Sequence, residues 1–152
     1  MLYDTDIGSI NQWGVVSVSY TDADASTYAG HYFRSDGNMA NVAYALRYER
    51  TVTDIVWRYC TGASCTTIAT WDHSLDDGDS FGYEVEGTGN DTVLRVWDFG
   101  GSVPARGSWG AADHTFTDNP ASAANTGTYI GLYDGHVNLA SFDDFAGGSY
   151  TP

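Results

Sequence analysis

Apolar and polar side chains alternate along most of this chain with a period of two residues, the pattern of strands that bury one face. Val16, Val18 and Tyr20, for example, alternate with Ser17 and Ser19. The same pattern predicts strands at residues 13–20, 29–34, 42–48, 55–59, 66–71, 81–85, 93–97, 129–133 and 139–145, with a short one around residue 116. Helical periodicity does not extend over ten residues anywhere in the sequence, so we predict nine or ten strands and no long helix.

Turn-forming sequences separate these predicted strands. Asp, Gly, Asn and Ser cluster at residues 35–38, 76–79, 87–90 and 134–135, and these residue types favour tight turns. Short strands joined by such turns are typical of two antiparallel sheets packed face to face. We therefore expect an all-β sandwich that forms one domain over residues 1–152, a length sufficient to bury a single core.

The charge of the chain excludes two classes of partner. Twenty acidic residues, six Arg and no Lys give a formal net charge of −14. Nucleic-acid binding through phosphates needs a basic stripe, and attraction to anionic lipid needs a basic patch. The sequence has neither, and it has no apolar run of the roughly 20 residues that span a membrane. We therefore predict a partner that is neither nucleic acid nor membrane.

Cys60 and Cys65 are the only cysteines, and they enclose four residues between two predicted strands. A zinc site would need two further ligands, and the four His residues are scattered along the chain. A redox pair would favour two intervening residues and a helix. We therefore predict a disulfide bond at a loop tip, which indicates an oxidising compartment.

Four short motifs follow one another along the chain: GHYFR at residues 30–34, DSFGYEVEG at 79–87, TYIGLY at 128–133 and FDDF at 142–145. In this order they resemble motifs of concanavalin A-like and laminin-G-like jelly rolls. The resemblance covers about residues 11–148 and implies a jelly-roll sandwich like that of carbohydrate-binding modules. Such modules carry one or two earlier strands, whereas ten residues precede Asn11 here. The resemblance thus suggests a missing N-terminal strand, or one supplied by a neighbouring chain in a homo-oligomer or larger assembly.

The same resemblance implies a structural calcium ion that connects the start of the chain to its last strand. Asp143 is the candidate ligand on that strand, and Asp4 and Asp6 are its candidate partners. Calcium takes six to eight oxygen ligands, which an Asp-rich chain can supply. The Asp-rich segments 22–24 and 76–79 are alternatives, although Asp in such loops also serves simply to form turns.

Aromatic side chains are more numerous than a core of this size needs, with five Trp and eleven Tyr. Aromatic faces flanked by hydrogen-bonding groups make good sites for amphipathic ligands such as sugars. Trp97 lies on the strand face opposite Leu94 and Val96 and is expected to be half exposed. Trp71 and Trp109 lie near predicted loops. We predict that these three Trp side chains contact a glycan.

Charged side chains offer little catalytic chemistry in this sequence. Glu84 and Glu86 alternate on one strand, as the acids of concanavalin A-like glycosidases do, but the third acid is absent. The simplest interpretation is two solvated carboxylates on an outer face, and each His is expected at the surface or in a turn. Arg95 and Arg106 could bind an acidic sugar, although the surrounding negative charge favours a neutral one. We therefore predict that the chain is not an enzyme.

These features favour a non-catalytic carbohydrate-binding or adhesion module, extracellular or on a particle or cell surface, and stabilised by calcium. The N-terminus shows no signal peptide. The alternative is a structural protein of an assembly, such as a virus-particle decoration protein or a surface-layer or fibre subunit, in which the same fold serves without a sugar site. A polysaccharide hydrolase or lyase, resting only on Glu84 and Glu86, is the third hypothesis.

Overall fold

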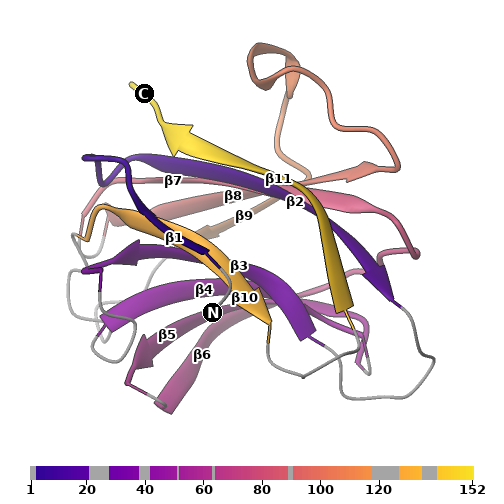
Figure 1. Cartoon of the computed structure of the whole chain (residues 1–152), viewed down its shortest axis with the longest axis horizontal. Coiled ribbons are helices and arrows are strands. Elements are labelled where there is room, and N and C mark those ends of the chain that lie inside the picture. The colour runs from indigo at the N-terminus through magenta and orange to yellow at the C-terminus, as the bar shows by residue number, and fades with distance from the viewer. Residues whose placement is uncertain are drawn as a thin grey trace.

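Eleven strands make up most of the part of the chain that the structure describes, and they form two antiparallel sheets (Figure 1). The structure is a computed structural model that describes residues 3–20, 28–37, 42–50, 52–62, 64–88, 91–117, 127–134 and 140–152. The strands are β1 (Tyr3–Asp6), β2 (Gln12–Tyr20), β3 (Tyr28–Ser35), β4 (Val42–Glu49), β5 (Asp54–Thr61), β6 (Ser64–Asp72), β7 (Ser80–Glu86), β8 (Val93–Gly100), β9 (His114–Thr117), β10 (Tyr129–Asp134) and β11 (Ala140–Ser149).

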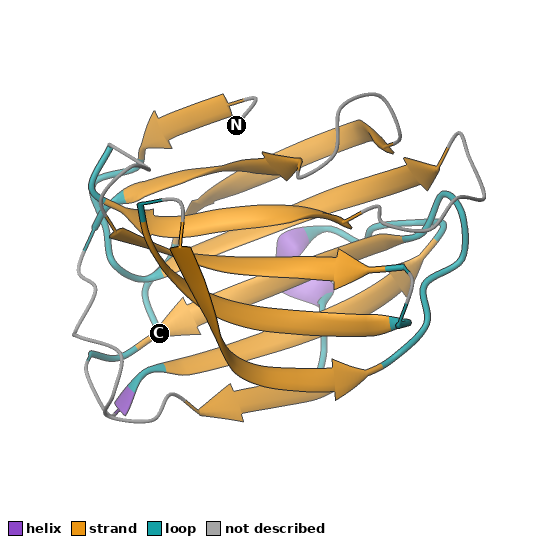
Figure 2. Cartoon of the chain, turned by 90° about the horizontal axis from the view of Figure 1, so that it is seen from below, coloured by secondary structure: helices purple, strands orange, loops and turns teal. Residues whose placement is uncertain are grey.

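The two sheets form the sandwich that the alternation predicts. One sheet has six strands in the order β1-β10-β3-β4-β5-β6, and the other has five in the order β11-β2-β7-β8-β9. Figure 2 shows that the strands of both layers run in nearly the same direction, as in aligned sheet packing. Each predicted run overlaps a strand of the structure. Among the described residues, no helix is long and apolar enough to cross a membrane.

The core between the sheets consists of side chains that alternation assigns to the inner face. Tyr44 packs against Phe33 and Trp57, with ring centroids 5.7 and 5.3 Å apart. Phe81 and Val96 from the five-stranded sheet are equally buried. Large inner-facing side chains on both sheets therefore hold the two layers together through the hydrophobic effect.

The first ten residues contain a strand that the alternation does not identify. β1 pairs with β10 at the edge of the six-stranded sheet, with Tyr3 opposite Leu132 and Asp6 opposite Tyr129. Four residues offer too few positions for a period of two to be recognised. The segment before Asn11, which the resemblance suggests lacks its strand, therefore does supply an outer strand of this sheet.

A buried hydrogen-bond network closes one end of the sandwich. Arg34 has no exposed surface, and its guanidinium donates to the carbonyl oxygens of Ile10 and Gly87 at 2.9 and 2.7 Å. The Arg34 backbone N–H donates to Gln12 Oε1, and Gln12 Nε2 donates to the carbonyl of Gly127. A buried charge is tolerated when it is hydrogen bonded. The network therefore fixes three connecting segments to β2 and β3.

His31 lies in the core and not at the surface, which corrects the expectation for this residue. Its ring centroid lies 5.3, 4.9 and 6.1 Å from those of Phe81, Tyr83 and Phe145. The side chain has no exposed surface. Burial lowers the pKa of His31 to about 3, because the charged ring would lose its hydration. His31 is therefore neutral in the folded protein at neutral pH.

Cys60 and Cys65 form the predicted disulfide bond at the tip of the β5–β6 hairpin. The two residues lie directly opposite each other in the register, with Cα atoms 4.0 Å apart. Cys60 is buried against Ala43 and Ala45 on the outer face of the six-stranded sheet. The bond therefore fixes the pairing of two neighbouring strands.

The pH dependence of stability tests the burial of His31. An unfolded His has a pKa of about 6.5, whereas the folded value is about 3, so the unfolded state takes up a proton first as the pH falls. The stabilisation from neutral His31 is complete above about pH 6.5 and should decline by about 1.4 kcal/mol per pH unit below it.

The variant His31→Leu removes this titration while the carboxylates titrate in both proteins. Urea denaturation across this pH range should show the free energy of unfolding of the wild type falling relative to that of the variant. Parallel pH curves for the two proteins would contradict the buried, neutral state.

Removal of the disulfide bond should lower the free energy of unfolding by about 2 kcal/mol, because a ring this small constrains the unfolded chain only modestly. The double variant Cys60→Ser, Cys65→Ser can be compared with the wild type by urea denaturation with and without a reducing agent. The reducing agent should destabilise the wild type and leave the variant unchanged. Equal stability of the oxidised wild type and the variant would show that the bond contributes nothing.

Candidate functional site

The candidate site lies on the outer face of the five-stranded sheet, beneath the segment between β8 and β9. This segment, residues 101–113, contains the 3-10 turn η2 (Arg106–Ser108) and stands out beyond the sheet in Figure 1. Trp109 from the segment packs against Trp97 and Trp13, with ring centroids 5.2 and 5.7 Å apart. Val15 joins the same apolar cluster. The outer face of this sheet therefore has a small core of its own.

Hydrogen bonds at the base of segment 101–113 hold its two ends together. The Asp98 backbone N–H donates to Asp113 Oδ2 at 2.9 Å, and the Asp113 backbone N–H donates to the Val96 carbonyl at 3.0 Å. The Asp98 carboxylate accepts from the Gly100 N–H and pairs with His73 Nε2, both at 2.8 Å. The segment therefore leaves and rejoins the sheet at fixed positions beside β8.

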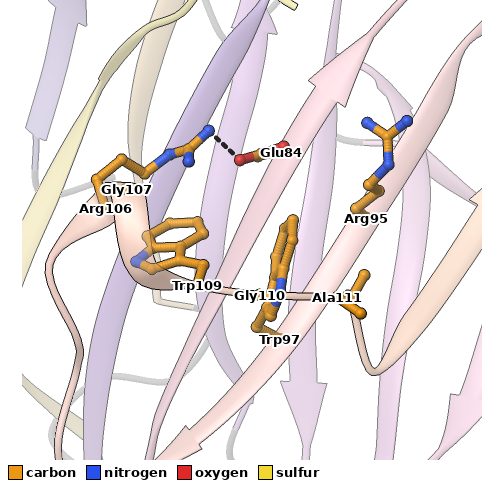
Figure 3. A pocket seen from close by; sticks show the side chains of 9 residues that line it. Glu84, Arg95, Trp97, Arg106, Gly107, Trp109, Gly110 and Ala111 are labelled. Carbon is orange, nitrogen blue, oxygen red and sulfur yellow. Dashed lines mark ion pairs between the residues drawn. The ribbon is translucent and has the colours of Figure 1, made fainter.

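A cavity of about 370 Å³ opens between this segment and the sheet, near the lower end of the size range of ligand pockets, about 300–1,000 Å³ (Figure 3). β7 and β8 supply its floor and segment 101–113 supplies its wall. It is lined by Glu84, Arg95, Trp97, Arg106, Gly107, Trp109, Gly110, Ala111 and Ala112. The cavity thus combines two indoles with three charged side chains.

Charged side chains alternate along the rim of this cavity. Glu84 forms an ion pair with Arg106, and Arg95 Nη2 lies 2.5 Å from Glu86 Oε1. Glu84 also lies directly opposite Arg95 in the register, and Figure 3 shows it between the two arginines. Tyr150 donates to Glu86 Oε2 at 3.4 Å. The hydrogen bond from Arg95 lowers the pKa of Glu86, so this carboxyl is ionised at neutral pH.

The Arg106 guanidinium lies among aromatic rings as well as against a carboxylate. Its Cζ atom is 4.6 Å from the ring centroid of Trp109, 5.4 Å from that of Tyr150 and 5.9 Å from that of Trp13. Tyr150 is held there because its backbone N–H donates to the Asn11 carbonyl at 3.2 Å. Cation–π attraction therefore supplements the ion pair in holding η2 against the sheet.

Two buried N–H groups at the cavity have no hydrogen-bond partner in the part of the chain that the structure describes. They are Trp97 Nε1 and Arg106 Nε. Trp97 is only 4% exposed, whereas Trp109 Nε1 donates to the Pro104 carbonyl at 3.1 Å. A buried donor without a partner costs about 1–3 kcal/mol.

The structure brings together two of the three predicted ligand-binding Trp residues. Trp97 and Trp109 line the same cavity. Trp97 is buried, and not half exposed as expected, because segment 101–113 covers the outer face on which it lies. Neither its burial nor its contact with Trp109 follows from the alternation along β8.

Trp71 lies elsewhere, on the edge strand β6. Its indole stacks with two imidazoles: the ring centroid of Trp71 lies 4.0 Å from that of His73 and 5.0 Å from that of His114, and the planes are within 14° and 8° of parallel. Burial, with the nearby charge of His73, lowers the pKa of His114. Trp71 is therefore engaged by structural neighbours and does not line the cavity.

The candidate calcium ligands occupy both sheets. β1, which carries Asp4 and Asp6, belongs to the six-stranded sheet, and β11, which carries Asp143, belongs to the other. The side chains of Asp4 and Asp143 lie outside the described part of the structure. Hydrogen bonds from Thr128 and the Gly8 N–H lower the pKa of Asp6. Among the described residues, no three His, Cys, Asp or Glu side chains are grouped to hold a metal ion.

The sequence pattern does not identify the charged and aromatic partners that complete the site. Glu84 is 8% exposed and ion-paired, which corrects its assignment as a solvated carboxylate. Trp13, which packs against Trp109 of segment 101–113, also belongs to the site. One signal for the site was available in the sequence. Glu84 lies between the inner-facing Tyr83 and Val85 and therefore points to the outer face, and the neighbouring strand carries both Arg95 and Trp97.

No family model matches the sequence, and no curated protein matches it. Solved structures do resemble its fold. The carbohydrate binding module CBM66 from Bacillus subtilis superposes with a TM-score of 0.58 at 10% identity, covering 97% of this chain and 78% of that one. Chicken galectin 2 superposes with a TM-score of 0.57 at 9% identity, covering 96% of this chain and 98% of that one.

A tetrameric galectin from the ball sponge Cinachyrella sp. gives a TM-score of 0.54 at 10% identity, with 96% of this chain and 98% of that one covered. Identities this low relate the folds alone. The similarity confirms the jelly-roll β-sandwich that the four sequence motifs predict.

Replacement of Glu84 by Gln should destabilise the protein by about 1–2 kcal/mol, because Arg106 then loses its counter-charge in a partly buried position. Amide hydrogen exchange should rise in residues 101–113 in particular. Glu49→Gln is the matched control, because Glu49 pairs with Arg47 on the other sheet. Equal exchange in segment 101–113 of both variants would show that the pair does not hold the segment.

Proposed function

We propose that this chain is a non-catalytic carbohydrate-binding domain and that sugar binds in the cavity between segment 101–113 and the outer face of β7 and β8. The observation that carries the proposal is the combination, in one cavity, of two Trp side chains and a Glu–Arg pair. The similar folds of a carbohydrate binding module and of galectins support it.

The chemistry of the cavity suits a sugar ring. The indoles of Trp97 and Trp109 provide apolar surface for C–H groups. The Glu84 carboxylate can accept from a hydroxyl. Few, well-placed polar groups among aromatic side chains are typical of small-molecule sites, because they fix the orientation of the ligand.

The charges of the site favour a neutral sugar. Two arginines, Arg95 and Arg106, are balanced by Glu84 and Glu86. A ligand carboxylate would have to compete with these internal partners for each guanidinium. In addition, the chain as a whole carries a net charge of −14, which repels anions.

The ion pairs formed by the two glutamates favour a binding role over glycoside hydrolysis. Glycoside hydrolysis requires a carboxylic acid that is protonated near neutral pH to act on the leaving group. The pKa of Glu86 is lowered by Arg95, and Glu84 is paired with Arg106. Both carboxylates therefore serve as counter-charges of arginines.

A location outside the cell or on a surface is part of this proposal, and the disulfide bond supports it because such bonds persist in oxidising compartments. A calcium ion held by Asp143 with Asp4 and Asp6 stays a prediction. The same holds for the alternative role as a subunit of a larger assembly.

Titration calorimetry with neutral oligosaccharides tests the proposed site. The probes are xylo-, cello- and fructo-oligosaccharides, and the wild type should bind at least one series. Trp97→Phe should weaken that binding about tenfold, because the smaller phenyl ring offers less apolar surface to the sugar than the indole. Trp109→Ala should weaken it further, because it removes most of one cavity wall.

Trp71→Phe is the matched control, because it makes the same exchange at an indole outside the cavity. Its affinity should equal that of the wild type. Equal losses in Trp71→Phe and Trp97→Phe would place the sugar elsewhere. Absence of binding to all three series and to a broad glycan array would contradict the proposed function itself.

A further inference from the structure

A second cavity opens on the outer face of the five-stranded sheet, on the other side of segment 101–113. Its volume is about 400 Å³, similar to that of the first. The sheet contributes Ser17 from β2, Ser80 from β7 and Ala146 from β11, and the segment contributes Ser102 and Val103. The first residues of the segment wall this cavity, and residues 106–112 wall the first one. One loop thus separates two cavities on one face.

The two cavities lie in line along β7. Ser80 lines the second and Glu84 lines the first, and an even separation places both on the same face of the strand. Four residues of extended chain separate their Cα atoms by about 13 Å. This distance exceeds the reach of a single sugar ring, so one monosaccharide can occupy only one of the two cavities.

Aromatic rings cover β7 between the two cavities. At Gly82, midway from Ser80 to Glu84, an added Cβ would lie 2.7 Å from Phe99 Cε2 and 3.3 Å from Trp109 Cη2. The absence of a side chain at this position allows both rings to lie directly on the strand. Phe99 is only partly buried, and its centroid is 4.9 Å from that of Trp109. An aromatic surface therefore connects the two cavities.

The second cavity differs from the first in its chemistry. Among the described residues that line it, none carries a charge and the polar side chains are hydroxyls. The Ser17 and Ser80 hydroxyls lie 2.5 Å apart and hydrogen bond to each other, which leaves further acceptor capacity on each oxygen. Small residues and hydroxyls suit a neutral polyhydroxylated unit. They offer less stacking surface than the two indoles of the first cavity.

We infer that the two cavities are subsites of one binding face and that the ligand is a neutral oligosaccharide of at least three units. One unit lies against Trp97 and Trp109, a middle unit contacts Phe99, and a further unit lies among Ser17, Ser80 and Ser102. This inference rests on the proposed carbohydrate-binding function and adds the length of the ligand and the face along which it runs.

Affinity as a function of chain length tests the inference. Xylo-, cello- and fructo-oligosaccharides of increasing length are titrated into the intact protein by calorimetry. For the series that binds, affinity should rise about tenfold from the monosaccharide to the trimer or tetramer and then level off, as the face becomes fully occupied.

Ala146→Ile should reduce the affinity for the tetramer to nearly that for the monosaccharide and leave the monosaccharide affinity unchanged. Ala146 is exposed, and a β-branched side chain on β11 fills the second cavity without disturbing the core. Ser102→Leu fills the same cavity from the loop and serves as a second variant. Thr70→Ile, at an exposed position of β6 in the other sheet, is the matched control and should bind like the wild type.

Three results would overturn the inference while the proposed function stands: affinity independent of chain length, tetramer affinity unchanged in both cavity-filling variants, or equal loss of monosaccharide and tetramer binding in them. A wild-type protein that binds no member of any series would instead contradict the proposed function. The two failures are therefore distinguishable in one set of titrations.

Discussion

The ion pair between Glu84 and Arg106 is the interaction on which the outer face of the five-stranded sheet depends. Glu84 is 8% exposed, and a carboxylate buried to this extent needs a compensating charge. Arg106 supplies that charge from η2, and in doing so it holds segment 101–113 down on the sheet. Trp109 then covers Trp97, and cavities form on both sides of the segment. This contact between loop and strand buries most of the outer face of β7 and part of that of β8.

Burial on two faces explains why the alternation predicts the fold well and the outer face poorly. Phe81 and Val85 face the core, and a period of two identifies their strand without further information. The same period places Glu84 on the other face of the strand, but it cannot show which segment covers that face. His31 presents the reverse case. It shares the inner face with Phe33, so its position indicates burial, whereas its residue type suggested the surface.

The candidate site could be predicted only in part, because its residues meet through a loop without a repeating pattern. The abundance of Trp made Trp97 and Trp109 separate candidates. Their contact depends on where segment 101–113 leaves and rejoins the sheet beside β8. Those points are fixed by hydrogen bonds from the Asp98 N–H to the Asp113 carboxylate and from the Asp113 N–H to the Val96 carbonyl, and no periodicity encodes them. Trp71 shows that residue type alone does not identify a site, because this indole stacks with two imidazoles on an edge strand of the other sheet.

The sandwich and the site are therefore set by different parts of the sequence. About 10% identity to the solved structures is enough to share a sandwich, since many residue choices satisfy inward alternation. The site lies on an outer face and on a loop, where the fold constrains residues least and function is usually carried. Its charges cancel in pairs within a chain of net charge −14. Under the proposed function, recognition at this face rests on stacking and hydroxyl geometry, while the acidic remainder of the surface repels anionic molecules.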